Sequence, residues 1–225
     1  MPKFFRFSIH CVIATIIGLL LVAAVNATPV FINEIHYDNA GSDQNEGFEI
    51  AGPANTDLLG WQLVLYNGSN GQPYSSKVLA GVIANLADGF GVLSFAYSGI
   101  QNGAPDGVAL IDHADQLVQF LSYEGAFTAV SGAASGQTSV DILVHEPSNT
   151  IIGSSLQLFG VGSEYEDFQW RESTAQSFGA VNSGQQFLAA VESVPAPSSL
   201  ALCLFALLIP WFGTRLRNQP RAISA

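Results

Sequence analysis

The segment from His36 to Glu46 holds the densest set of oxygen-bearing side chains in the sequence, and such a set could bind a metal ion. The candidate ligands are Asp38, Asn39, Asp43 and Glu46. Carboxylate, amide and backbone oxygens are the ligands that Ca²⁺ takes in sets of about six to eight. The spacing differs from that of an EF-hand, whose ligands recur at every second residue. The segment therefore predicts either a calcium site or an Asx-rich turn that caps the neighbouring strands.

Catalytic chemistry has less support in the residue pattern. The histidines between the terminal apolar runs are His36, His113 and His145, and no Gly-x-Ser-x-Gly motif or paired-histidine motif accompanies them. We expect each of these histidines at the surface or at a strand end, and we expect no catalytic residue and no bound cofactor other than calcium. A carboxylate pair for hydrolysis stays open, because the tertiary structure sets the distance between two carboxylates.

The charge is unevenly distributed along the chain. All 18 Asp and Glu residues lie between Glu34 and Glu192, where Lys77 and Arg171 are the two basic residues, so this segment has a net charge of −16. Such a charge repels phosphate backbones, since affinity for nucleic acids depends on Lys and Arg. Nucleic acid is therefore not an expected partner.

The N-terminus has the layout of a Sec signal peptide. Lys3 and Arg6 precede an apolar run over 11–25, and small residues follow, with the predicted cleavage between Ala27 and Thr28. Residues 1–27 are thus expected to direct export, with a retained N-terminal anchor as the alternative. Both cysteines lie in terminal apolar runs, so the exported body has no disulfide or thiolate site.

The C-terminus carries a proline motif, an apolar run and a basic tail. Pro195 and Pro197 lie in a linker over 188–197, and the apolar segment and tail occupy 198–225, with Arg215 and Arg217 after the apolar run. This order resembles the PEP-CTERM sorting signal, although Ala196 stands where that family has Glu. The resemblance implies a transmembrane sorting segment, an exosortase-type enzyme as partner, and membrane attachment before release to the surface or the extracellular space. A plain membrane anchor is the alternative.

Between these ends the hydrophobic pattern alternates with period two, which is typical of β-strands. Short strands at this spacing predict an all-β sandwich or barrel. Asn67-Gly68 and Asp106-Gly107 predict turns, 126–138 a surface loop, and 179–192 a path toward a tether. The predicted strands are 30–37, 47–51, 61–66, 76–80, 91–96, 108–111, 117–122, 139–143, 155–159 and 167–170.

Several motifs in this region, in this order, resemble the lamin-tail domain family. They are Ile32-Asn33-Glu34-Ile35-His36-Tyr37-Asp38, Gly47-Phe48-Glu49-Ile50, Leu58-Leu59-Gly60-Trp61-Gln62-Leu63 and Asp106-Gly107-Val108-Ala109-Leu110. The resemblance implies an immunoglobulin-like β-sandwich over 28–187 that binds or anchors. Gly60 permits a tight turn that brings the ring of Trp61 into the core, with a ligand platform as the alternative role of that ring.

Together these patterns predict an exported, envelope- or matrix-associated, non-enzymatic protein. Its expected partners are a surface polymer or an envelope protein, and calcium could assist the adhesion. The alternative is a hydrolase, or an accessory subunit of a secreted nuclease or phosphatase.

Overall fold

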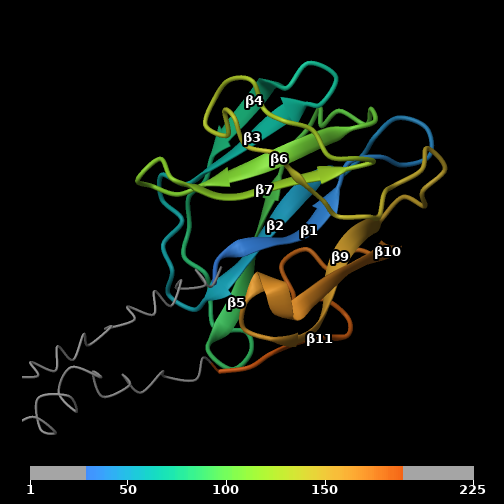
Figure 1. Cartoon of the computed structure of the whole chain (residues 1–225). Helices are drawn as coiled ribbons and strands as arrows, with labels where there is room; N and C mark the ends of the chain where they lie inside the picture. Colours follow the sequence, from blue (N-terminus) through green and yellow to red (C-terminus); the bar gives the residue numbers. More distant parts are fainter. Residues whose placement is uncertain (1–28, 190–225) are drawn as a thin grey trace, which may run out of the picture.

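The computed structural model describes residues 29–189, which form two β-sheets packed face to face (Figure 1). The one helical element in this range is a short 3-10 turn, η1 (Tyr165–Asp167). The predicted all-β class is therefore confirmed. The signal peptide with Ala27 and Thr28, the proline motif with Pro195 and Pro197, and the tail with Arg215 and Arg217 lie outside the described residues.

The first sheet has the strand order β10-β9-β1-β2-β5, and β11 pairs with the last residues of β9. The second sheet has the order β4-β3-β6-β7-β8. The strands are β1 (Phe31–His36), β2 (Gly47–Pro53), β3 (Gln62–Asn67), β4 (Gln72–Val78), β5 (Phe90–Ala96), β6 (Asp106–Ile111), β7 (Leu117–Tyr123), β8 (Val140–Asp141), β9 (Ser154–Gly162), β10 (Phe168–Ala175) and β11 (Gln185–Phe187).

Each of the ten predicted strands overlaps one of β1 to β10, but three details of the prediction are wrong. β4 begins at Gln72, four residues before the predicted start. Asp106 and Gly107 begin β6 instead of forming a turn, because Asp106 pairs with both Asn67 and Tyr123 on the neighbouring strands. The segment 179–192 contains β11, which pairs in parallel with β9.

The main core lies between the two sheets. Ile35, Phe48, Leu63 and Leu110 are among its fully buried side chains. Trp61 belongs to the same cluster with 8% of its surface exposed. Gly60 just before it has φ +83°, a conformation that residues with a Cβ rarely adopt. The glycine thus lets the chain turn sharply as the indole ring enters the core.

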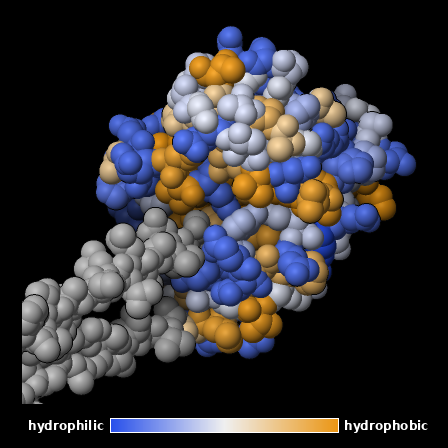
Figure 2. Space-filling model, viewed as in Figure 1, coloured by the Kyte–Doolittle hydropathy of each residue, from blue (hydrophilic) through white to orange (hydrophobic). Residues whose placement is uncertain are grey.

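Both sheets also bury part of their outer faces. Phe127 from the 126–138 segment packs against Phe120 over the second sheet, where the sequence predicted only a surface loop. Over the first sheet, Phe187 of β11 stacks on Phe90 with ring centroids 5.3 Å apart. Elsewhere, exposed apolar residues form small patches among polar ones in the view of Figure 2.

The two ends of the described chain lie at the same end of the sandwich (Figure 1). At the start, Pro29 and Val30 lie against the position of Gly52. At the finish, Phe187 stacks on Phe90, which pairs with the last residue of β2. The loops β1–β2, β5–β6 and β8–β9 lie at the other end, where they share hydrogen bonds. None of the helical structure within 29–189 is long and apolar enough to cross a membrane.

Candidate functional site

The structure brings together two of the four predicted calcium ligands, Asp38 and Asp43. The backbone N–H of Asn39 donates to Oδ1 of Asp43 over 3.3 Å, which folds the loop back on itself. Burial raises the pKa of the Asp38 carboxyl, and the neighbouring charge of Asp43 raises it further. An oxygen-rich pair thus exists at the loop end of the sandwich.

The side chain of Asn102 hydrogen-bonds to Asp38, and the other two predicted ligands also have structural partners. Both carboxylate oxygens of Glu46 accept backbone hydrogen bonds, from Gly99 and Ile100, over 2.8 Å each. The side-chain N–H of Asn39 donates to the carbonyl of Gln44 over 2.9 Å, and its Oδ1 is buried without a partner. Among residues 29–189, no three His, Cys, Asp or Glu side chains are grouped so that they could hold a metal ion. Calcium binding remains a prediction.

A fully buried ionisable contact joins the side chains of His36 and Glu146. Nδ1 of His36 lies 2.9 Å from Oε1 of Glu146, and both side chains are fully buried. The second oxygen of Glu146 accepts the backbone N–H groups of Tyr37 (2.7 Å) and Asp38 (3.1 Å). Ser173 of β10 also donates its hydroxyl to Oε1 over 3.2 Å. One carboxylate therefore connects the end of β1, the β8–β9 segment and β10.

The surroundings of His36 favour its charged form. Burial alone lowers the pKa of the ring, but the hydrogen bond and the charge of Glu146 outweigh it, so the pKa lies above its ordinary value. The other ring nitrogen, Nε2, lies 3.0 Å from the carbonyl of Gln44. The amide nitrogen of Asn39 also lies 3.0 Å from Nε2, so an imidazolium donates to Glu146 and Gln44 but cannot accept from Asn39.

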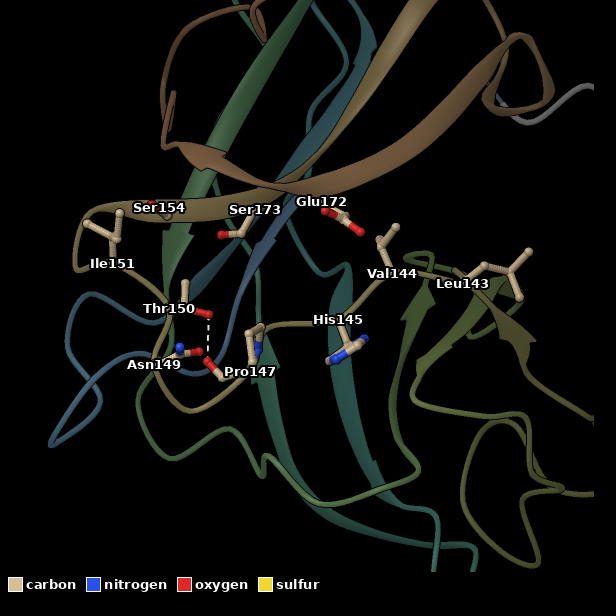
Figure 3. A pocket seen from close by; sticks show the side chains of 10 residues that line it. All are labelled: Leu143, Val144, His145, Pro147, Asn149, Thr150, Ile151, Ser154, Glu172 and Ser173. Carbon is tan, nitrogen blue, oxygen red and sulfur yellow. Dashed lines mark hydrogen bonds between the residues drawn. The ribbon is translucent and has the colours of Figure 1, made fainter.

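A groove of about 420 Å³ opens outside this buried pair, between the 143–151 segment and β10 (Figure 3). Glu172 and Ser173 of β10 form one wall, and the segment around His145 forms the other. Glu146 positions both walls, since it belongs to one and binds Ser173 of the other. The lining residues are Leu143, Val144, His145, Pro147, Asn149, Thr150, Ile151, Ser154, Glu172 and Ser173.

Three polar side chains of the groove, here called uncommitted, have no polar partner in the described part of the chain. Those of His145, Asn149 and Glu172 are exposed and make no hydrogen bond or ion pair with the rest of the described chain. Thr150, by contrast, donates its hydroxyl to the carbonyl of Pro147 over 2.6 Å (Figure 3). A concave site with a few convergent free polar groups is the usual form of a ligand site.

The positions of all three histidines agree with the prediction of a surface or strand-end residue. His113 and His145 are exposed, as expected for surface residues. His36 does lie at a strand end, but its ring is fully buried. Glu146 and the groove residues other than His145 were not predicted from the sequence, because they belong to no motif and come together only when β10 lies beside a segment about 25 residues earlier.

The known proteins offer no further guide to this site. A comparison of the chain with protein-family models, curated proteins and solved structures finds no match.

Proposed function

We propose that this protein is an exported, non-enzymatic binding module, in which the groove beside β10 holds a surface polymer or an envelope protein. The observation that carries the proposal is the convergence of three uncommitted polar side chains, His145, Asn149 and Glu172, on a groove of about 420 Å³. Polar side chains that make no hydrogen bond or ion pair within the described part of the chain are available to an external partner.

The position of the groove supports this role. Ser154, in the groove, is the first residue of β9, whereas β11 and the end of the described chain lie beside the last residue of β9. At about 3.3 Å per residue, these points are roughly 25 Å apart along the strand. A chain attached through its termini would therefore present the groove away from the attachment.

The histidines support binding over catalysis. His36 has the carboxylate partner that a general base would need, but its ring is sealed inside the protein. His145 is open to ligand, yet it makes no hydrogen bond with Ser173, whose hydroxyl is bound to Glu146. A base must come within hydrogen-bond reach of the group that it activates. The hydrolase alternative gains no support from these contacts.

We propose further that the sandwich has the immunoglobulin-like fold of the lamin-tail family. An immunoglobulin-like sandwich of the lamin-tail type is supported by the two packed sheets and by the buried Trp61 that follows Gly60. For the termini, we propose Sec export with cleavage after Ala27, followed by membrane attachment and sorting through 198–225 by an exosortase-type enzyme. The support there is the residue pattern alone.

Two experiments test the proposal. Fractionation of the native cells, with mass spectrometry of the mature chain, should find the protein in the envelope or the medium with an N-terminus at Thr28. The purified chain should also bind washed envelope and matrix polymers saturably and leave them intact. Cytoplasmic protein, or turnover of the polymer by the chain, would contradict the proposed function.

A further inference from the structure

Two carboxylates lie directly opposite each other in the first sheet. Glu34 of β1 pairs with Glu49 of β2, and neither has any exposed surface. Like charges at directly opposed positions of a sheet destabilise it, and a buried charge normally needs a charged partner. Residues 176–184, here called the strap, cover this pair, although they lie more than 120 residues away from it in the sequence.

The strap is held down by hydrogen bonds to these carboxylates. The backbone N–H of Ser177 donates to Oε1 of Glu34 over 2.8 Å, and its hydroxyl donates to Oε2 over 3.0 Å. The backbone N–H of Gly179 donates to Oε2 of Glu49 over 2.6 Å. The side-chain amide of Asn182 adds bonds to two strand carbonyls, and Val181 packs against the outer apolar cluster of the first sheet.

Within residues 29–189, no basic side chain contacts either carboxylate of the pair. The remaining donors to Glu34 are the side chains of Ser155 and Gln157 on β9, and Asn33 donates to Glu49 over 3.0 Å. The nearest charged group in this network is Arg171 of β10, which donates to the far oxygen of Gln157 over 2.7 Å. On β5, Ser94 lies opposite Glu49, and the strap itself has no charged residue.

From this geometry we infer that the strap is a pH-dependent cover, which stays closed while the Glu34–Glu49 pair holds a proton and opens when both carboxylates ionise. Water reaches the pair most easily if the strap lifts, because the strap lies over it on the outer face of the sheet. Hydration of two ionised carboxylates then favours the open form.

The titration of the two groups agrees with this direction. Burial raises the pKa of Glu49 to about 8, against the bonds from Asn33 and Gly179, and the charge of Glu34 adds to the rise. Burial also raises the pKa of Glu34. Ionisation therefore favours any conformation in which these values return to normal, and lifting the strap is a smaller change than unfolding the sheet.

The chain beyond the strap has its own attachment. β11 pairs with β9, Phe187 is fully buried, and the N–H of Leu188 donates to the carbonyl of Gly162 over 2.9 Å. None of these contacts involves an ionisable group. The open form therefore keeps β11 in place and uncovers Gln157, Glu34 and Glu49, which lie in a polar row across the sheet between the half-buried Arg171 and the exposed Ser94.

Hydrogen–deuterium exchange of the full chain tests the inference, with the amides of β2 and of 186–188 as internal references. Between pH 6 and pH 9, after correction for intrinsic exchange, protection of the amides of 177–182 should fall at least tenfold relative to both references. A ratio that stays within threefold would overturn the inference, and so would an equal fall in 186–188.

Two variants assign the effect to the pair. The variants Glu49→Gln and Glu34→Gln each remove one ionisable group of the pair. In at least one of them, the protection of the 177–182 amides should no longer fall between pH 6 and pH 9, even if the protection at pH 6 differs from that of the wild type. The matched control is Asp115→Asn, an exposed carboxyl in a turn of the second sheet, which should keep the wild-type fall. If the protection of these amides still falls in both glutamine variants, other groups cause the pH dependence and the inference is contradicted.

Discussion

His36 and Glu146 form a fully buried pair in which Nδ1 of the ring lies 2.9 Å from Oε1 of the carboxylate. The residues lie 110 positions apart in the sequence, and the contact fixes the β8–β9 segment to the end of β1. Because the same carboxylate binds Ser173, the pair also sets the width of the groove. A structural ion pair thus supports the site proposed to bind ligand.

Removal of the Glu146 carboxylate should destabilise the protein strongly. Glu146→Ala leaves His36 and the N–H groups of Tyr37 and Asp38 buried without their acceptor. Breaking a buried pair costs about 3–5 kcal/mol. Urea unfolding at pH 6 measures the loss. Glu172→Ala, an exposed neighbour, should change stability by less than about 0.5 kcal/mol, and equal effects of the two changes would contradict this role.

Stability should fall as the pH rises from 5 to 9. Burial raises the pKa of Glu49 from 4.5 to about 8, so the folded state binds more protons than the unfolded state between these values. The raised pKa values of Glu34 and His36 act in the same direction. At about 1.36 kcal/mol per pKa unit, the loss is on the order of a few kcal/mol.

Denaturant titrations at several pH values check this slope. Glu49→Gln should flatten the curve above pH 6, because it removes one of the groups that release a proton on unfolding. A stability that increases toward pH 9 would show that the buried carboxyl groups do not control the pH dependence.

Trp61 should contribute to stability as a core residue. Trp61→Ala removes a large side chain that is only 8% exposed and leaves a cavity, which costs about 3–5 kcal/mol. Leu59→Ala, at a residue that is 66% exposed, is the matched control and should have little effect. A small loss for Trp61→Ala, together with loss of ligand binding, would favour the ligand-platform role.

Calcium should bind weakly at Asp38 and Asp43. With two carboxylates brought together, we expect a Kd in the range of about 10⁻⁴–10⁻³ M. At tenfold excess over Kd, native-state binding stabilises by about 1.4 kcal/mol, or roughly 3–5 °C in Tm. Thermal titration measures it with Mg²⁺ as the control ion.

Substitution of Asp43 and of Glu46 should have different effects on the rise in Tm with calcium. Asp43→Asn should abolish the rise in Tm. Glu46→Gln should lower Tm without removing the calcium response, because Glu46 binds Gly99 and Ile100 instead of the proposed site. An unchanged Tm at millimolar calcium would contradict calcium binding and favour the interpretation of the loop as an Asx-rich turn.

The strand pattern was predictable from the sequence because alternation is a local property. Leu63 and Leu65 of β3 face the core with the period of two that the pattern predicts. The alternation is hidden in β1, where all six residues from Phe31 to His36 are buried. The strap covers Glu34, whereas Glu146 covers His36, and neither contact is indicated by the residues near them in the sequence.

The candidate site was less predictable because it depends on contacts between distant segments. Nothing near Glu34 in the sequence indicates that Ser177 will cover it, since the two are 143 residues apart. The acidic loop was found as a cluster, but the backbone around Gly99 engages one of its predicted ligands. Oxygen-bearing residues can be counted along the sequence, but the sequence does not show which of these oxygens will accept hydrogen bonds from backbone N–H groups and so be less available to a metal ion.

The most direct test of the proposed function measures binding of the full chain to washed envelope and matrix polymers with the groove altered. The double variant Asn149→Ala with Glu172→Gln removes two of the three uncommitted polar groups and should weaken binding at least tenfold, while Asp115→Asn should bind like the wild type. Equal binding by all three proteins, or no saturable binding by the wild type, would contradict the account.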